Sequence, residues 1–393
     1  MKQKTTVGKI AVISAFHYAW FWVPIWVLFY KRFTDYSGVA LLEALSMFAF
    51  LAMIVPGGLL ADYIGRKRLL ILASITNAVG AGVVGFAGSF TAVAVGIAVM
   101  SLSGGLFTAS VEAMLYDFLK TENREEQYKK IWGKMTTVRM LTSAAASLVG
   151  GYVYSIDIRL PWFGVAVASL AAFFVALTLR EPRIETPHDS FPQFLREAGK
   201  GVTELFRKEV WKLSITLLLI GIFFTTDSSG LWDIQAVEYG FSSQTLGVLL
   251  TITYLCLAVV SWYATKITRK FSSFGGILMF AVVWAVLWFV SGISGGIIGA
   301  LLLILRSSFS VVADIQSSGV WNGMISSRVR ATTLSTITII RGLPYILVAS
   351  NIGMVIDSVG IQWLIRSFAV LMFVLLIPTC VWWMRRGKHT PTQ

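Results

Sequence analysis

Five ionisable side chains interrupt long apolar stretches of this sequence: His17, Glu112, Asp227, Arg306 and Asp314. An ionised group at the centre of an apolar helix in hydrocarbon costs at least about 2.5–3.5 kcal/mol, so each such residue is a functional hypothesis by default. The imidazole and the three carboxylates can bind and release protons, and the guanidinium can hold an anion. These residue types therefore predict proton transfer and charge recognition.

Asp227 is the strongest candidate for a proton-binding residue because neighbouring hydroxyls and Gly230 would loosen the helix that carries it. Arg306 admits three interpretations: it neutralises Asp227, binds an anionic group of a substrate, or only packs. His17 either carries a proton, since imidazole titrates near neutral pH, or serves as a structural donor.

Two acid and base pairs recur in the chain. Glu112 and Arg139 are each expected roughly 12–14 Å from a helix end, at 1.5 Å per residue. Asp314 and Arg341 repeat them at a distance of 202 residues. We interpret both as structural or gating ion pairs, with a direct role of either acid in proton transfer as the alternative.

The elements that must position these residues are apolar helices. The chain of 393 residues is 56% hydrophobic and 13% charged, against about 25% charged residues in soluble domains. No charged residue occurs between Arg68 and Glu112 or between Lys270 and Arg306. Because a crossing needs about 20 apolar residues, we predict an all-α membrane protein with twelve spans, at residues 10–30, 39–60, 69–88, 92–116, 131–155, 160–179, 213–235, 245–264, 274–292, 295–318, 332–355 and 364–384.

The basic residues gather in alternate loops, which predicts an inner (cell) membrane location with both termini cytoplasmic. The net charge of +13 therefore indicates topology and lipid contact rather than nucleic-acid binding. The two cysteines lie in apolar runs and predict neither a disulfide framework nor a metal site.

The polar stretch 181–212 divides the chain into two predicted six-helix bundles, residues 1–180 and 213–393, with the stretch itself as a cytoplasmic linker. An internal repeat at 202–203 residues relates the bundles: Arg66 falls on Arg269 and Tyr36 on Tyr239. Parallel repeats of this kind occur in one large class of transporters.

The predicted turn between the second and third spans reads Gly58-Leu59-Leu60-Ala61-Asp62-Tyr63-Ile64-Gly65-Arg66-Lys67-Arg68-Leu69-Leu70. It resembles the G-x-L-A-D-r-x-G-r-k-x-x-l signature of the major facilitator superfamily, although Tyr63 replaces the usual basic residue. The resemblance implies a gating function for Gly58, Asp62, Gly65, Arg66 and Lys67. We expect Gly58 to permit close helix approach, Gly65 to form a tight turn, and Arg66 to reach Asp117. Thr265 replaces Asp62 in the second half, so the lock is expected on one side.

The resemblance also implies a secondary active transporter that works by alternating access as a monomer, with the cavity lined by spans one, four, seven and ten. We favour proton-coupled efflux (antiport) of a small amphiphilic compound, with proton-coupled uptake of a polar or anionic metabolite as the alternative. The predicted fifth span lacks the Gly-Pro pair of drug-proton antiporters, which leaves the direction open.

Enzymatic activity is not expected. No phosphate-binding loop for ATP occurs in the sequence. We expect no cofactor, and we expect a proton gradient to supply the energy for transport. An intramembrane serine hydrolase is the alternative from another class, because Gly292-Ile293-Ser294-Gly295-Gly296 matches a serine-nucleophile pattern. A sensor or scaffold without transport activity is a further alternative.

Overall fold

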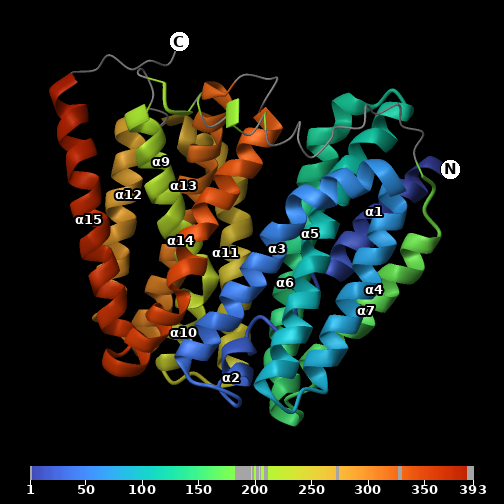
Figure 1. Ribbon diagram of the computed structural model, residues 1–393, viewed down its shortest axis with the longest axis horizontal. Helices are drawn as coiled ribbons and strands as arrows, with labels where there is room; N and C mark the ends of the chain where they lie inside the picture. The colour runs from blue at the N-terminus through green and yellow to red at the C-terminus, as the bar shows by residue number, and fades with distance from the viewer. Residues whose placement is uncertain are drawn as a thin grey trace. The chain divides into compact units, whose positions relative to one another are not determined.

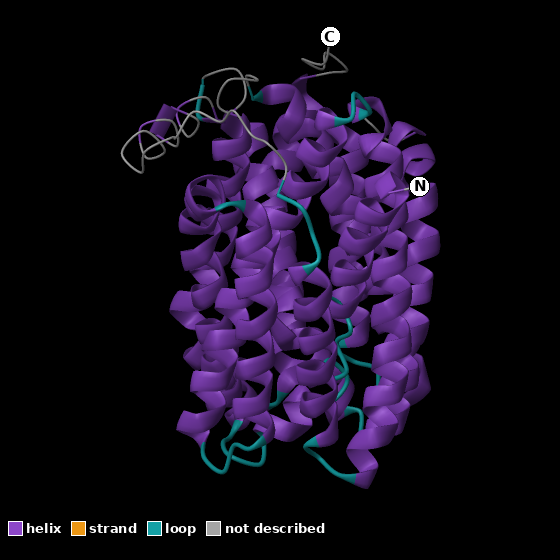
Figure 2. Ribbon diagram, turned by 90° about the vertical axis from the view of Figure 1, so that its right-hand side faces the viewer, coloured by secondary structure: helices purple, strands orange, loops and turns teal. Residues whose placement is uncertain are grey.

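The computed structural model describes residues 2–181, 196, 199–200, 203, 205–207, 211–270, 274–325 and 330–386. In this part of the chain every regular element is a helix, and Figure 2 shows no strand. The helices in Figure 1 are α1 (Lys2–His17), α2 (Trp26–Tyr30), α3 (Tyr36–Ile64), α4 (Arg66–Gly85), α5 (Phe90–Thr121), α6 (Tyr128–Ile156), α7 (Leu160–Leu177), α9 (Trp211–Thr226), α10 (Trp232–Glu238), α11 (Ser243–Lys270), α12 (Phe274–Ser291), α13 (Gly296–Met324), α14 (Arg330–Val359) and α15 (Ile361–Arg386). A 3-10 turn, η1 (Glu125–Gln127), precedes α6, and a π-helical segment, η2 (Asp227–Leu231), joins α9 to α10.

The helices are long and apolar enough to explain the hydropathy of the sequence. Nine candidate membrane spans lie among the described residues: α3, α4, α5, α7, α9 to α10, α11, α13, α14 and α15. The apolar parts of α1 and α12 are shorter, and α6 carries four basic residues in its first half. The all-α membrane fold is confirmed, whereas the count of twelve spans stays a prediction.

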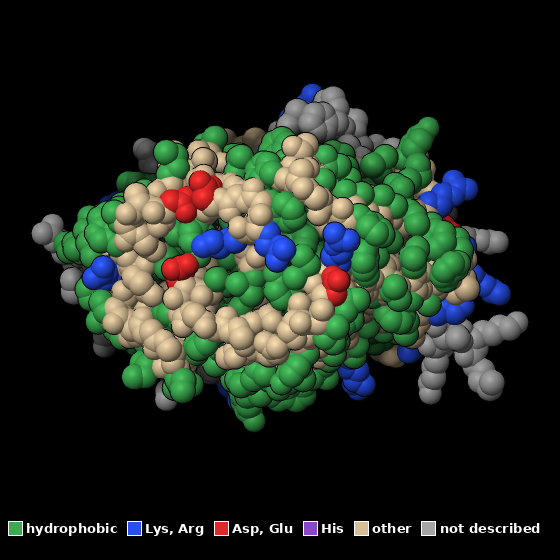
Figure 3. Space-filling view, turned by 90° about the horizontal axis from the view of Figure 1, so that it is seen from below, with side chains coloured by type: hydrophobic (Ala, Val, Ile, Leu, Met, Phe, Trp, Pro, Cys, Tyr) green, Lys and Arg blue, Asp and Glu red, His purple; other side chains and the backbone are tan. Residues whose placement is uncertain are grey.

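Large apolar side chains lie on the outside of these helices, as expected where lipid rather than water is the solvent. Leu347, Trp262 and Ile297 are 77–79% exposed. Figure 3 views one end of the helices, where hydrophobic side chains are abundant and several Lys, Arg, Asp and Glu side chains are visible among them.

The chain forms two compact units, each of which is discontinuous in sequence. Unit 1 contains residues 1–34, 42–193 and 242–255, and unit 2 contains residues 35–41, 194–241 and 256–393. Two helices are therefore divided: α3 begins in unit 2 and continues in unit 1, and α11 begins in unit 1 and continues in unit 2. Most of the predicted linker 181–212 lies outside the described residues.

The core of unit 1 is built where α4, α5 and α7 pack with α1. Leu69 on α4, Met114 on α5 and Ala176 on α7 are fully buried in one apolar cluster, which Ile13 of α1 completes. In unit 2 the largest fully buried side chains are aromatic, among them Trp284 and Trp288 of α12.

The first predicted span, residues 10–30, is not a continuous helix. Helix α1 ends at His17, residues 18–25 form successive turns, and α2 begins at Trp26. Two groups of α6 accommodate this irregular backbone: the Ser143 hydroxyl donates to the carbonyl of Tyr18 at 2.9 Å, and Gly150 leaves space for Phe21. A Cβ atom at Gly150 would lie 1.9 Å from the Phe21 carbonyl oxygen. Non-helical backbone at membrane depth is tolerated only where protein or an aqueous cavity satisfies it, which is the situation here.

Candidate functional site

The signature turn carries a closed electrostatic contact in unit 1. The Arg66 guanidinium forms an ion pair with Asp117 of α5 and donates to the carbonyl oxygen of Ala113 at 2.8 Å. Gly65, which precedes α4, has φ +94°, a conformation that favours glycine. The predicted contact between Arg66 and Asp117 is therefore confirmed, as is the tight turn at Gly65.

The start of α4 is capped by a residue that sequence reasoning missed. The Glu181 carboxylate accepts from the backbone amides of Arg66 at 2.7 Å and Lys67 at 3.0 Å. Because Gly65 has no side chain to cap these amides, an acid from a distant segment takes that role. The only available signal was the absence of a local cap at Gly65, and we had interpreted Glu181 as the start of the linker.

One expectation for this turn is wrong. Gly58 does not mediate a close helix approach, because no described atom lies within 4 Å of a Cβ built on it. The neighbouring Gly57 faces α5 instead, with its Cβ position 3.0 Å from the Cβ of Ala109. Gly57 and Gly58 are adjacent in the sequence and point to different sides of the helix. A prediction of the span alone does not determine which of the two faces the neighbouring helix. The side chains of Asp62 and Thr265 lie outside the described part of the structure.

The predicted pair in the second half forms in unit 2. Arg341 Nη2 lies 2.9 Å from Asp314 Oδ1, and the guanidinium carbon lies 5.4 Å from the Phe224 ring. The Arg341 and Asp314 side chains are 16% and 39% exposed.

The corresponding pair in the first half does not form, which corrects our expectation for Glu112 and Arg139. The Tyr128 hydroxyl donates to Glu112 Oε1 at 2.5 Å, while Arg139 Nη2 donates to the Ser14 hydroxyl at 3.2 Å. The Arg139 guanidinium lies over aromatic rings, 4.4 Å from the centre of Trp132 and 5.0 Å from that of Tyr18. Cation–π contact thus replaces the carboxylate that we expected.

His17, the last residue of α1, lies near Arg139 and the aromatic rings around it. Its ring stacks on Phe107 of α5 with centroids 3.7 Å apart and planes 7° from parallel. The Phe107 ring is also 6.0 Å from the Arg139 guanidinium. Aromatic packing therefore fixes the imidazole within unit 1.

Asp227 opens the π-helical segment η2, where the helix of the predicted seventh span changes geometry. Gly230 has φ +105°, and the Ser229 hydroxyl donates to the carbonyl of Thr225 at 2.7 Å. Hydroxyls thus satisfy backbone groups that the irregular turn releases. The predicted loosening of this helix by glycine and hydroxyl groups is confirmed.

Asp227 and Arg306 of α13 form an ion pair inside unit 2. Asp227 Oδ1 lies 2.9 Å from Arg306 Nη2, and the exposed fractions of the two side chains are 7% and 0%. Of the three interpretations of Arg306, the structure supports neutralisation of Asp227.

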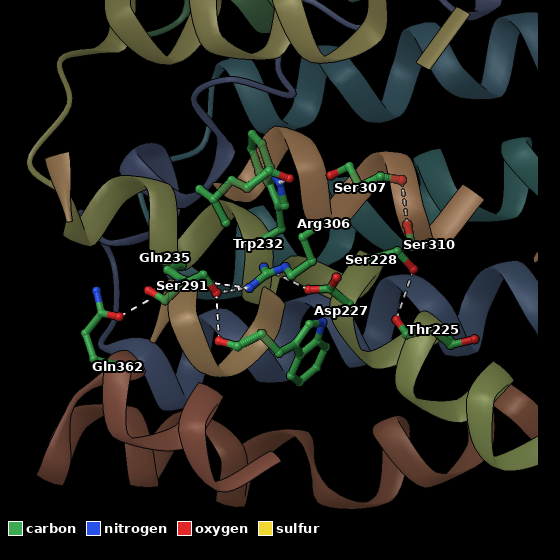
Figure 4. A network of polar contacts seen from close by, with 12 residues as sticks. Thr225, Asp227, Ser228, Trp232, Gln235, Ser291, Arg306, Ser307, Ser310 and Gln362 are labelled. Atoms are coloured by element: carbon green, nitrogen blue, oxygen red, sulfur yellow. Dashed lines mark hydrogen bonds and ion pairs between the residues drawn. The ribbon is translucent and has the colours of Figure 1, made fainter. Parts of the chain in front are cut away.

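Neutral polar groups from three helices complete the surroundings of Arg306 (Figure 4). Arg306 Nη1 donates to Gln235 Oε1 of α10 at 2.7 Å and to the Ser291 hydroxyl of α12 at 3.1 Å. The Gln235 amide group in turn donates to Tyr239 Oη at 2.8 Å and to Gln362 Oε1 of α15 at 3.3 Å. Sequence analysis missed Gln235, Ser291 and Gln362, although a fully buried glutamine in an apolar helix is itself a signal of a polar partner.

Ser310, which we placed on the same polar face as Arg306, does not join this network through its hydroxyl. It donates to the carbonyl oxygen of Ser307 at 2.8 Å, within α13. Ser294, the residue of the nucleophile-like pattern, donates to the carbonyl oxygen of Val290 at 2.8 Å. Among the described residues no group of three or more His, Cys, Asp or Glu side chains is arranged to hold a metal ion.

The two units therefore present different chemistry. Unit 2 holds a compensated charge pair at an irregular helix turn, and unit 1 holds an arginine among aromatic rings beside an irregular chain segment. Buried charge next to non-helical backbone is typical of solute and ion sites in membrane transporters.

Comparison with known proteins agrees with this interpretation. The family profile described as Major Facilitator Superfamily matches residues 10–349. The uncharacterized MFS-type transporter YxaM of Bacillus subtilis (strain 168) is 25% identical over 254 residues, which cover 63% of this chain and 62% of YxaM.

Solved structures show the same fold at low sequence identity. The crystal structure of the nucleoside transporter NupG has a TM-score of 0.78 at 16% identity, with 99% of this chain and 100% of NupG covered. An auto-inhibited POT family peptide transporter has a TM-score of 0.75 at 13% identity, with 99% and 98% covered. These relatives are named as transporters and not as enzymes, in agreement with the expectation from the sequence. The match across most of its length and the shared fold show that the chain belongs to the major facilitator superfamily.

Proposed function

We propose that the protein is a secondary active transporter that works by alternating access and exports a small amphiphilic compound in exchange for protons. The observation that carries this proposal is the buried ion pair of Asp227 and Arg306 at the π-helical segment. The cell membrane, cytoplasmic termini, a monomeric state and an energy source in the proton gradient, without a bound cofactor, belong to the same proposal.

The ion pair couples protonation to conformation through its burial. A proton on Asp227 would remove the carboxylate that, among the described residues, lies at ion-pair distance from Arg306, whose side chain is 0% exposed, and would leave only the more distant charge of Asp233. Gln235 and Ser291 are neutral and cannot supply the lost negative charge. Since an uncompensated charge in the interior is strongly unfavourable, protonation favours a state in which Arg306 gains water or another anion.

Segment η2 is the element that would respond. Its backbone departs from the α-helix at Ser229 and Gly230, and the hydroxyls of Ser228 and Ser229 both donate to the carbonyl of Thr225. Because π-helical turns are frequent at functional sites, we take this segment as the one that changes geometry. Proton binding at Asp227 and movement of α10 are linked in this mechanism.

The signature turn supplies the second part of the mechanism, which is control of interconversion. The ion pair of Arg66 with Asp117 and the cap of Glu181 on α4 stabilise the observed arrangement of unit 1. A state that separates α4 from these acids must replace both contacts. This turn therefore affects the rate of exchange between states rather than the affinity for a solute.

The test is transport by the purified protein in proteoliposomes with an imposed pH gradient. Accumulation of an amphiphilic cation or anion in the lumen when the lumen is acidic indicates exchange for protons, whereas accumulation only when the outside is acidic indicates symport. We expect Asp227→Asn to abolish gradient-driven accumulation and to retain solute binding. Asp314→Asn, which alters a more exposed acid in the same unit, is the matched control.

Undiminished accumulation by Asp227→Asn would remove Asp227 from the coupling mechanism. His17, Glu112 and Asp314 would then be the remaining acid or base candidates. Accumulation that is insensitive to either gradient would refute proton coupling altogether.

Uptake of a polar or anionic metabolite is the second candidate function. It is favoured by Arg139, because the described part of the chain provides no carboxylate within ion-pair distance of its guanidinium. The direction of the productive gradient in the same assay distinguishes the two candidates.

A further inference from the structure

Arg139, Arg306 and Arg341 lie inside helices, away from the helix ends, and the contacts of Arg139 differ from those of the other two. Arg306 is paired with Asp227 and Arg341 with Asp314, both at 2.9 Å. Arg139 is 8% exposed, yet no described carboxylate lies within 4 Å of it. Arg139 is thus the one of the three without a described carboxylate at ion-pair distance, and the charge of Glu112 acts on it only from farther away.

The internal repeat makes this difference informative. Arg139 and Arg341 are 202 residues apart, as are Glu112 and Asp314, so the sequence offers the same acid and base in both halves. In unit 2 the two side chains meet, whereas in unit 1 the Tyr128 hydroxyl holds Glu112 and leaves Arg139 to other contacts. In unit 1 the arginine is therefore present without direct contact with the equivalent carboxylate.

From this geometry we propose that Arg139 binds the carboxylate of a small aromatic organic acid in unit 1. The inference rests on the proposed function, since it names the chemical class of the transported solute. It assigns to Arg139 a ligand-binding role in place of the gating role that the repeat suggested.

The groups around Arg139 fit both ends of such a molecule. A guanidinium presents several N–H donors in a plane and binds a carboxylate through two parallel hydrogen bonds. Here Nη2 donates to the Ser14 hydroxyl at 3.2 Å, the Tyr18 hydroxyl also interacts with the guanidinium, and Nε has no hydrogen-bond partner among the described residues. The rings of Tyr18 and Trp132 lie 5.0 and 4.4 Å from the guanidinium and provide aromatic contacts for the body of such a molecule, whereas Phe107 is already stacked on His17.

The irregular chain segment places these groups. Tyr18 is the first residue after α1, and its carbonyl accepts from Ser143 of α6, one helical turn beyond Arg139. Ser14 and Arg139 are therefore held together by α1 and α6 where the first span loses its helical geometry. Backbone breaks of this kind occur where a membrane helix contributes to a solute site.

The experiment is isothermal titration calorimetry of the purified full chain in detergent, with matched acid and amide probes. Phenylacetate and indole-3-acetate carry the proposed carboxylate, and phenylacetamide and indole-3-acetamide have the same rings without the charge. We expect the wild type to bind each acid at least tenfold more tightly than its amide. Arg139→Met should abolish that preference, and Arg341→Met, at the equivalent position of the repeat, should retain it.

The proposal is overturned if the wild type binds acid and amide equally, if neither acid binds at millimolar concentration, or if the preference survives in Arg139→Met. Should Arg139→Met fail to give a monodisperse protein, Arg139→Lys keeps the charge but loses the planar fork of donors. A preference unchanged in Arg139→Lys would refute the two-bond geometry. An acid preference without any flux in proteoliposomes would support this site and refute the transport function, so the two failures are distinguishable.

Discussion

Two ion pairs of unit 2 have the same length but differ in burial. They therefore permit a quantitative test of how burial changes the free-energy cost of removing one partner of an ion pair. The pair of Asp227 with Arg306 and the pair of Asp314 with Arg341 are both 2.9 Å long. The Asp227 side chain is 7% exposed and the Asp314 side chain 39%. The matched changes are Asp227→Asn and Asp314→Asn, each alone and combined with Met in place of the partner arginine.

The magnitudes follow from what each change leaves behind. Asp227→Asn strands Arg306 without solvent, and removal of one partner from a buried pair costs about 3–5 kcal/mol. Asp314→Asn leaves a more accessible Arg341, and exposed pairs contribute about 0.2–1 kcal/mol. The two single variants should therefore differ by roughly 2–4 kcal/mol. Asp227→Asn with Arg306→Met removes both charges and should recover most of the loss, because an apolar replacement of a buried pair is often close to neutral.

Thermal unfolding of the detergent-solubilised protein, followed by tryptophan fluorescence at one scan rate, gives the order of apparent midpoints. We expect the order Asp227→Asn, then its double variant, then Asp314→Asn and the wild type close together. Equal destabilisation by the two single variants would show that water reaches Arg306. A double variant less stable than Asp227→Asn would show that Gln235 and Ser291 depend on the arginine more than the arginine depends on its acid.

Two further predictions concern the backbone that surrounds the candidate residues. Glu181→Gln should weaken the cap of α4 by about 0.5–2 kcal/mol and slow transport while solute affinity, measured by titration, stays within twofold; a change confined to affinity would contradict the assignment of this turn to interconversion. Gly150→Ala should destabilise the protein by about 1–3 kcal/mol because its Cβ would meet the Phe21 carbonyl, whereas Gly133→Ala on the same helix, with nothing within 4 Å, should be neutral or stabilising; equal midpoints in thermal unfolding would contradict this.

The sequence predicted the helices and half of the charge chemistry because both depend on one-dimensional patterns. Apolar length identified the helices, and the repeat placed Asp314 beside Arg341. The same reasoning failed for Glu112 and Arg139, because similar depth does not determine the direction of a long side chain. A nearby hydroxyl and two aromatic rings, which hydropathy ignores, decided where these two groups lie.

Other features were beyond prediction because they join distant parts of the chain. The Glu181 cap on α4 connects residues that are 115 positions apart. The partners of Arg306 come from α10 and α12, and their convergence depends on helix packing. The break after His17 escaped the span prediction because residues 18–25 are as apolar as a continuous span, although Pro24 among them is a helix-breaking signal.

The irregular backbone segments connect the fold to the proposed chemistry. Residues 18–25 interrupt the first helix of the chain, and residues 227–231 interrupt the helix that follows the predicted linker. A shift of 202 residues, the distance that separates Glu112 from Asp314, carries residues 18–25 onto residues 220–227, so the two interruptions coincide only at Asp227. Hydrogen bonds lost at membrane depth must be replaced, so each interruption is expected to serve a purpose that a regular helix does not. In each case a candidate charge lies beside it, Arg139 in unit 1 and Asp227 in unit 2. The two halves thus differ in the position of the interruption and in the charge beside it, in keeping with the proposed anion site at Arg139 and the proposed proton site at Asp227.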